Sequence, residues 1–384
     1  MPRKHFLLTF FAMMALMLPS RVPATTVFIN LISDSRPYRI LPGAADNYWI
    51  VDQGHGLILL TKTPPDVWSV QYFSISGAFD ATGPDPDGRL FVSVRAAQPS
   101  VKIFDTNSRA VVASIPIYDG AWHYPNGLAL STDYSHLYVC APAWPAVGEF
   151  FSYVDSGLHP DSGRVYDIDL ATNTISRTAV VGALPQTIHL SPYNELLVSA
   201  DEMYDIKEPV NSELVSVVGQ EEYVDIIDLQ SFTRMQRIAC NSNWSYDYTN
   251  DLAQWNSDGR YVAVCNPEAY GIASHPAFSD AIWIIDTADN SVSSTIGVID
   301  SNHRYGAKSL IVSDACTDGA YVAINQYDDT NSQRILLIDK SSGEVEQAVD
   351  TGTEIIPEFL YELPDGRLIV TGGVSGKLAI IDPT

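Results

Sequence analysis

The sequence predicts an all-β fold built from one repeated unit, and three observations support this. Residues 121–139, AWHYPNGLALSTDYSHLYV, place a polar turn at Asp133 between two apolar strands, a pattern typical of a β-hairpin. The same order recurs in TGPDPDGRLFVSV, LSPYNELLVSA, WNSDGRYVAV, CTDGAYVAI and LPDGRLIVTGG. An apolar strand ending in Asp follows each copy, as in VKIFDT, VYDIDL, VDIIDL, IWIIDT, ILLIDK and LAIIDP. Strand repeats without helices, at a period of about 40 to 65 residues, predict a β-propeller.

The N-terminal segment has the pattern of a secretory signal peptide. Arg3 and Lys4 precede an apolar run from Phe6 to Leu18, and Val22-Pro23-Ala24 offers a small-residue cleavage site. A buried N-terminal helix is the alternative interpretation. We therefore expect residues 1–24 to be removed, residues 25–384 to form a single propeller domain, and the protein to be secreted or periplasmic.

The polar turns set the number and the closure of the blades. They fall near residues 46, 87, 133, 194, 258, 318 and 365, which predicts seven four-stranded antiparallel blades. The last blade supplies only three strands before Asp382. The segment TTVFINLI at the start of the mature chain has the alternation of the other outer strands. We expect this N-terminal strand to complete the last blade and so to close the ring.

The charge of the chain excludes two classes of partner. The net charge is −24, and removal of residues 1–24 leaves 19 Lys and Arg against 46 Asp and Glu, a net charge of −27. Such a surface repels phosphate backbones and anionic lipid head groups. We therefore expect no nucleic-acid partner and no membrane partner, whereas an extracellular protein partner stays open.

Cysteines and one sequon carry two further expectations. The four cysteines are Cys140, Cys240, Cys265 and Cys316, and a secretory route permits disulfides. Cys240 and Cys265 are the pair that neighbouring blades would bring to one rim, so they are the candidate disulfide. Asn243-Trp244-Ser245 is a glycosylation sequon in a eukaryotic secretory route, which would make the protein a glycoprotein.

Insertions enlarge three consecutive blades. They occupy residues 141–163, 201–221 and 266–280, between the second and third strands. Insertions in repeat proteins map to loops, and long loops in compact domains are often functional. We expect them to form a rim on the face where each chain segment enters its innermost strand.

Parts of the repeat resemble known propellers. DSGRVYDIDLATNTISRTAVV, and SDGRYVAVC with IWIIDTADNSVSSTIGV, resemble the YVTN family of extracytoplasmic propellers. PNGLALSTDYSHLYV is similar to a blade of gluconolactonase and other SMP-30-like lactonases. The resemblance covers nearly the whole mature chain as a repeat pattern, and it implies the fold more than an activity.

The lactonase resemblance also implies a divalent cation held by Glu, Asn and Asp at the channel. Asn126 stands in the matching PNG motif, and Asp80, Asp251 and Glu358 offer further oxygen ligands. Tyr38 replaces the first-blade glutamate of that family. We therefore expect no cofactor and assign no metal ligand, with a divalent cation such as calcium as the open alternative.

Alignment of the blades predicts a ring of polar residues at the channel mouth. Its members are Tyr38, Asp80, Asn126, Gln186, Asp251, Lys308 and Glu358. Two interpretations compete: polar side chains that need only water as partners, or convergent groups for binding and acid–base chemistry. Aromatic, histidine and arginine residues surround the ring, which favours the second interpretation: Trp122, His123, Tyr124, His189, Trp244, Tyr246, Tyr248, His303, Arg304 and Tyr305.

We therefore predict an enzyme that acts on an organic small molecule at the channel mouth by acid–base or orienting catalysis, as a hydrolase, isomerase or cyclase. Lactone hydrolysis, isomerisation and cyclisation in a biosynthetic pathway all fit. The predicted catalytic residues are His123, His189 and His303 for proton transfer, with Asp251 and Glu358 to orient them. The predicted substrate-binding residues are Asp80, Trp122, Tyr124, Asn126, Gln186, Trp244, Tyr248, Arg304, Tyr305 and Lys308.

Two other functions remain open from the sequence. The first is a non-catalytic YVTN-type module that binds an extracellular protein or a glycan. It would need a flat, open apolar rim, whereas an enzyme needs a closed pocket with inward histidines. The second is the propeller subunit of a periplasmic amine dehydrogenase, which would need a cofactor-bearing partner chain.

Overall fold

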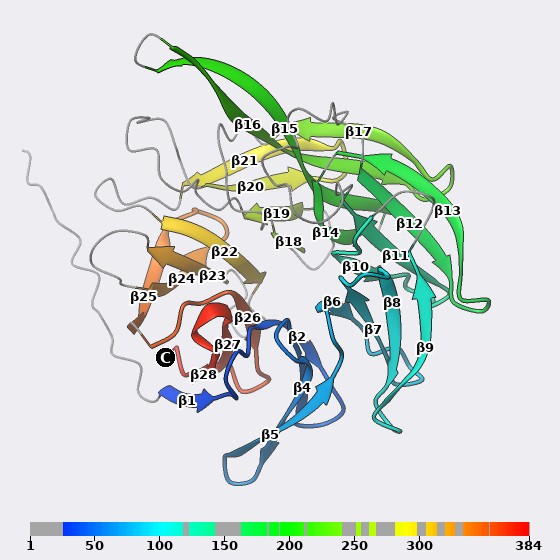
Figure 1. The fold of residues 1–384 in the computed structure, drawn as a ribbon. Coiled ribbons are helices and arrows are strands. Elements are labelled where there is room, and N and C mark those ends of the chain that lie inside the picture. Colours follow the sequence, from blue (N-terminus) through cyan, green and yellow to red (C-terminus); the bar gives the residue numbers. More distant parts are fainter. Residues whose placement is uncertain are drawn as a thin grey trace, which may run out of the picture.

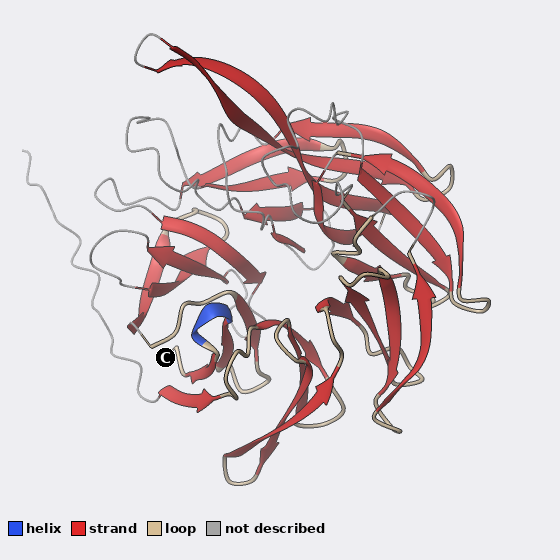
Figure 2. Cartoon of the chain, viewed as in Figure 1, coloured by secondary structure: helices blue, strands red, loops and turns tan. Residues whose placement is uncertain are grey.

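A computed structural model describes most of the chain after the N-terminal segment. The described residues are 26–117, 123–142, 163–182, 184–191, 193–210, 213–239, 251–254, 261–265, 281–297, 305–312, 319–326, 333–352 and 354–383. They form β-strands and a single turn of 3₁₀ helix, η1 (Gly373–Ser375) (Figure 2). The predicted signal peptide, residues 1–24, lies outside them.

The strands pair into four-stranded antiparallel sheets that succeed one another around a central axis (Figure 1). From innermost to outermost strand, the first three sheets in chain order are β2 (Pro37–Pro42), β3 (Asn47–Asp52), β4 (Gly56–Thr63) and β5 (Val67–Ser74); β6 (Ala78–Thr82), β7 (Arg89–Val94), β8 (Ser100–Asp105) and β9 (Ala110–Pro116); and β10 (Leu128–Leu130), β11 (His136–Ala141), β12 (Gly163–Asp169) and β13 (Thr174–Val181).

The remaining sheets follow the same order. They are β14 (Leu184–Ser191), β15 (Glu195–Val210), β16 (Glu213–Asp228) and β17 (Thr233–Ala239); β18 (Asp251–Gln254), β19 (Tyr261–Cys265), β20 (Ala281–Asp286) and β21 (Ser291–Gly297); β22 (Tyr305–Val312), β23 (Gly319–Gln326), β24 (Gln333–Asp339) and β25 (Val345–Gly352); and β26 (Phe359–Glu362), β27 (Leu368–Gly372), β28 (Lys377–Ile381) and β1 (Thr26–Asn30).

The predicted closure of the last blade is confirmed. Strand β1 pairs antiparallel with β28, from Thr26 opposite Ile381 to Asn30 opposite Lys377. Phe28 is exposed, whereas Ile29 packs against the cluster between the last sheet and the first. The structure therefore confirms a β-propeller of four-stranded antiparallel blades with an N-terminal strand in the last blade.

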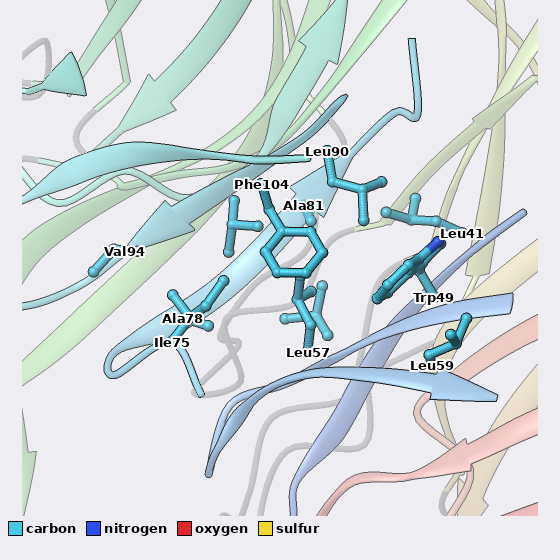
Figure 3. Close-up of a cluster of buried hydrophobic side chains, with 12 residues drawn as sticks. Leu41, Trp49, Leu57, Leu59, Ile75, Ala78, Ala81, Leu90, Val94 and Phe104 are labelled. Atoms are coloured by element: carbon cyan, nitrogen blue, oxygen red, sulfur yellow. The ribbon is translucent and has the colours of Figure 1, made fainter. Parts of the chain in front are cut away.

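Apolar side chains between neighbouring sheets form the core. Between the first and second sheets, Trp49, Leu57, Leu90 and Phe104 are buried, and the Phe104 ring packs edge-on against Trp49 with ring centroids 5.4 Å apart (Figure 3). The innermost strands of successive sheets also contact one another around the axis, and β26 contacts β2. Inward-facing residues of these strands therefore share the central channel.

Polar turns join the first and second strands where the sequence predicts them. Asp133 accepts hydrogen bonds from the Ser131 hydroxyl and from the Ser135 hydroxyl and amide, and these bonds lower its pKa to about 2. The turns near residues 46, 87, 133, 194 and 365 are confirmed. The turns near 258 and 318 lie outside the described residues.

One predicted loop insertion is a strand ribbon instead. Residues 201–210 continue β15 and residues 213–221 belong to β16, and the two strands pair from Glu195 opposite Asp228 to Val210 opposite Glu213. The ribbon projects well beyond its sheet, at the top of Figure 1. The antiparallel register is unbroken over these residues, so their backbone groups bond between the two strands. The insertions at 141–163 and 266–280 fall largely or wholly outside the described residues.

Two further expectations concern the cysteines and membrane-spanning helices. Cys140 is buried with a free thiol, and burial raises the pKa of that thiol to about 12. Cys240 lies outside the described residues, so the Cys240–Cys265 disulfide stays a prediction. Within the described part of the chain, no helix has the length and apolar character of a membrane span.

Candidate functional site

One side-chain network links three blades at the channel entrance, on the side where the chain enters its innermost strands. Asn126 is fully buried. Its amide oxygen accepts hydrogen bonds from Nε and Nη2 of Arg95, and its amide nitrogen donates to Pro185 O (2.9 Å) and to Gln186 Oε1 (3.1 Å). The predicted pair Asn126 and Gln186 is therefore brought together, but Arg95 was not predicted.

Arg95 fills the space beside this network. Its guanidinium carbon lies 3.3 Å from the centroid of the Phe79 ring. Burial lowers the pKa of Arg95 to about 10, so the group remains cationic at neutral pH. Asn126, the asparagine of the PNG motif, thus presents its side-chain oxygen to the Arg95 guanidinium.

This arrangement does not fit the divalent cation that the lactonase resemblance implies. A metal ion needs the oxygens of Asn126 and Asp80, yet each of these side chains accepts from an arginine. Within the described residues, no group of three or more His, Cys, Asp or Glu side chains is placed to bind a metal.

The innermost strands share a second, deeper layer of residues. Ser93, Ser199 and Thr371, on the second strands, accept hydrogen bonds from the amides of Asp80, Thr187 and Phe359, at 3.0 to 3.2 Å. Asp80 therefore corresponds to Thr187 and Phe359, and Phe79 to Gln186 and Glu358. The predicted ring therefore combined residues of two layers, because Asp80 lies one residue further along its strand than Gln186 and Glu358 do along theirs. The difference arises after Asp80, since Asp80 and Ser93 are 13 positions apart, whereas the equivalent pairs Thr187–Ser199 and Phe359–Thr371 are 12 apart.

An ion pair joins the first two blades in this layer. Arg39 Nε donates to Asp80 Oδ1 at 2.5 Å, and the Asp80 side chain is 3% exposed. The Arg39 guanidinium carbon also lies 4.9 Å from the centroid of the Phe359 ring. Tyr38 packs edge-on against the same ring, at 4.3 Å between centroids. Asp80 and Phe359 thus hold the guanidinium in one orientation.

A cavity of about 390 Å³ lies beside Arg39 among the innermost strands, and we call it the channel cavity. Its lining residues are Arg39, Thr82, Gly83, Pro84, Gly127, Leu128, Ala129, Leu130, Tyr134, Thr187, Ile188, His189 and Leu190. Gly83, Pro84 and Tyr134 belong to connections between first and second strands. In antiparallel blades these connections lie at the opposite end from those between second and third strands, so the channel cavity lies toward the face opposite the insertions.

His189 brings an imidazole to this cavity. Burial, with a smaller contribution from the Arg39 charge, lowers its pKa to about 4, so the ring is neutral at neutral pH. Thr187 lines the cavity beside it, with its hydroxyl 2.9 Å from Ser199 Oγ. A neutral imidazole both donates and accepts a hydrogen bond, which suits a polar organic ligand.

The structure explains why the last residue of the PNG motif, Gly127, is a glycine. A Cβ atom at this position would lie 2.8 Å from Gln186 O and 2.9 Å from the Thr187 Cα. The Gly127 amide donates to Gln186 O at 3.0 Å. Only glycine lets the third blade approach the fourth so closely at the wall of the channel cavity.

Other predicted residues take different positions. His123 is 2% exposed and contacts Tyr166 edge-on, with centroids 6.2 Å apart, and Tyr166 belongs to the core between the second and third sheets. His123 therefore lies in blade packing and does not line the channel cavity. The Glu358 side chain packs over Gly373, where an added Cβ would meet its Cγ at 2.7 Å. Tyr124 is partly buried.

The remaining predicted residues are not described as side chains. Trp122, Trp244, Tyr246, Tyr248, His303 and Arg304 lie outside the described residues. Asp251 lies in β18, and Tyr305 and Lys308 lie in β22, where the structure gives the backbone. Their proposed roles stay predictions.

Sequence reasoning missed Arg39 and Arg95, although each had a signal. The chain has only 22 Lys and Arg residues, and these two flank apolar strand segments that otherwise build blades. A charged residue in a channel-facing strand of so acidic a protein needs a specific partner. That argument could have selected both arginines.

Comparisons with known proteins support the fold. No family model matches the chain. Antigen Lp49 from Leptospira interrogans is 32% identical over 117 residues, which are 30% of this chain and 23% of that protein. The match thus spans about a quarter of that relative's length. A chain of hydrazine synthase from Kuenenia stuttgartiensis superposes with a TM-score of 0.64 at 16% identity, over 92% of this chain and 97% of that one. This likeness shows the β-propeller fold alone.

Proposed function

We propose that the chain is a secreted or periplasmic propeller of seven blades, of the YVTN and SMP-30-like kind, that acts on an organic small molecule held in its channel. The observation that carries this proposal is the channel cavity, which Arg39 and His189 line together with Thr187. Its volume of about 390 Å³ lies in the range of small-molecule pockets. The proposed site therefore lies deeper in the channel than the predicted site, toward the face opposite the insertions.

The chemistry that this cavity favours is orientation of a substrate with modest acid–base help. His189, with a pKa of about 4, is a weak base at neutral pH and serves mainly as a hydrogen-bond partner. Lactone hydrolysis, isomerisation or cyclisation can proceed when such a pocket aligns the reacting groups.

A panel assay tests this proposal. Purified mature protein is incubated with γ- and δ-lactones, and proton release is followed with a pH indicator, beside thermal-shift measurements with the same compounds. We expect turnover or stabilisation by at least one compound, and loss of either effect in His189→Gln. His55→Gln is the control, because His55 bonds the backbone oxygen of Ser33 at 2.8 Å and does not line the cavity. No response to the panel, or the same response in His189→Gln, would refute the proposed site.

The β15–β16 ribbon favours a second candidate function, a module that binds an extracellular protein or glycan. Beyond the pairing of Asp201 with Glu222, the described strands of the ribbon pair only with each other and project from the sheet (Figure 1). Replacement of residues 203–220 by Asn-Gly would preserve a hairpin, because Met203 lies opposite Gln220. Glycan-array binding by the full protein that is lost in the shortened variant would support this function over catalysis.

A further inference from the structure

We propose that a Ca²⁺ ion binds at the loop that closes the propeller ring, with the Asp52 carboxylate and the Ser35 hydroxyl among its ligands. This closing loop, residues 31–36, connects β1 of the last blade to β2 of the first. Its residues are not among those that line the channel cavity, and the inference does not depend on the proposed function. The observation that carries it is a pair of buried oxygens, Asp52 Oδ2 and Ser35 Oγ, that have no hydrogen-bond partner.

Asp52 lies fully buried at the end of β3, and the protein uses only one of its carboxylate oxygens. Oδ1 accepts hydrogen bonds from the amides of Arg36 (2.7 Å) and Gly54 (2.9 Å), whereas Oδ2 has no donor. In the part of the chain that the structure describes, no Lys or Arg side chain forms an ion pair with Asp52. Protonation would not satisfy Oδ2, because its O–H group would lack an acceptor. A buried carboxylate without compensation is costly, so Oδ2 needs a further partner.

Other oxygen atoms lie beside this carboxylate. Ser35 is 3% exposed, and it directly precedes the residue whose amide bonds Asp52. The Asp34 carbonyl oxygen lies over Gly54, where an added Cβ would meet it at 2.1 Å and Asp52 Oδ1 at 3.2 Å. A carboxylate, a hydroxyl and a carbonyl form an all-oxygen set, which is what Ca²⁺ prefers.

A cation fits these oxygens better than a water molecule does. Asp52 Oδ2 and Ser35 Oγ are both closed off from solvent. A hydrogen-bonded water would lie about 2.7 to 2.8 Å from each, whereas Ca²⁺ binds oxygen at about 2.3 to 2.6 Å. A cation also balances the Asp52 charge, which a water molecule cannot do. Mg²⁺ suits the site less well, because it demands near-octahedral geometry and keeps several waters.

The position of the site links the ion to ring closure. The closing loop contacts both ends of the ring: the Leu31 amide donates to Gly376 O (3.2 Å) in the last blade, and the Ile32 amide donates to the Tyr72 hydroxyl (3.0 Å) in the first. A cation between this loop and β3 strengthens the attachment of the loop to the first blade. A single carboxylate predicts weak binding, with a Kd of about 10⁻⁴ to 10⁻³ M, as in extracellular Ca²⁺ modules.

Thermal unfolding of the purified mature protein tests the site. The protein is treated with EDTA, desalted, and then measured in CaCl₂ or MgCl₂ at about 10 mM and constant ionic strength. A Kd of about 1 mM predicts that Ca²⁺ raises Tm by about 2 °C more than Mg²⁺ does. The Mg²⁺ measurement accounts for divalent cations that gather at the acidic surface. Equal shifts in the two salts would overturn the proposal, and this comparison needs no variant.

Two variants locate the ion. In Asp52→Asn the amide oxygen can still accept from the amides of Arg36 and Gly54, whereas the NH₂ group cannot bind a cation. We expect this variant to lose the Ca²⁺-specific shift. Ser35→Ala removes only the hydroxyl, and a tenfold weaker affinity would reduce the shift to less than about 1 °C. A full Ca²⁺ shift in either variant would overturn the proposed ligands.

Asp85→Asn is the matched control. Asp85 is also buried, but both of its carboxylate oxygens have partners. Oδ1 accepts from the amides of Asp87 and Arg89, and Oδ2 accepts from the Arg89 side chain. This variant should therefore have a lower Tm in every buffer and retain the full Ca²⁺ shift. Loss of the shift here would show that the response is not specific to Asp52 and would reject the site.

Discussion

The guanidinium carbon of Arg95 lies 3.3 Å from the centroid of the Phe79 ring, while its nitrogens donate to Asn126. Arg95→Ala removes both contacts and leaves the buried Asn126 oxygen without these donors. We expect a loss of about 2 to 3 kcal/mol in the free energy of unfolding, measured by urea denaturation. Arg109→Ala is the control, because Arg109 makes an exposed hydrogen bond to Gln71, and it should change stability by less than about 0.5 kcal/mol. Equal effects of the two substitutions would contradict the role of Arg95.

The close approach at Gly127 gives a second prediction. In Gly127→Ala the new methyl group would lie within 3 Å of backbone atoms of Gln186 and Thr187, so β14 would have to move. We expect a destabilisation of about 1 to 3 kcal/mol, as in other overpacked sites. Thermal unfolding checks the loss, and wild-type stability would show that the blades can separate at this point without cost.

Strand β1 gives a third prediction. Ile29 is partly buried against the cluster at the closing blade, whereas its neighbour Phe28 is 41% exposed. Ile29→Ala should lower the free energy of unfolding by about 1 to 2 kcal/mol, and Phe28→Ala by less than about 0.5 kcal/mol. Guanidinium denaturation of both variants measures the difference. A larger effect of Phe28→Ala would mean that β1 presents its other face to the core.

His189 gives a pH-dependent prediction. Its pKa is lowered from 6.5 to about 4 in the folded protein, so the unfolded chain takes up this proton first as the pH falls. Its effect on stability is therefore absent above about pH 7 and becomes unfavourable between about pH 6.5 and 4. One pKa unit corresponds to about 1.4 kcal/mol, so the cost approaches about 3 kcal/mol at pH 4. His189→Gln should lose less stability than wild type between pH 7 and 4 in urea titrations. Parallel pH curves would contradict the burial of the ring.

The sequence predicted local features well because they depend on neighbours along the chain. The Asp133 turn and the alternation in residues 26–30 are readable from a few residues, and both are confirmed. The β15–β16 ribbon could not be separated from a loop, since its polar and acidic composition resembles that of solvated segments. The channel was harder still. The longer connection between Asp80 and Ser93 shifts Asp80 by one layer relative to Gln186 and Glu358, and packing between blades places His123 in the core. An alignment on the turns alone shows neither effect.

The pairing of β1 with β28 has a consequence for biogenesis. Strand β1 leaves the ribosome near the start of synthesis, yet its hydrogen-bonding partner spans Lys377–Ile381. Until β28 has been synthesised, the edge of β1 has no pairing partner within its own chain. It can then pair with other nascent polypeptides. A premature stop shortly before residue 377 should therefore yield chains that aggregate, even though nearly every blade is already encoded.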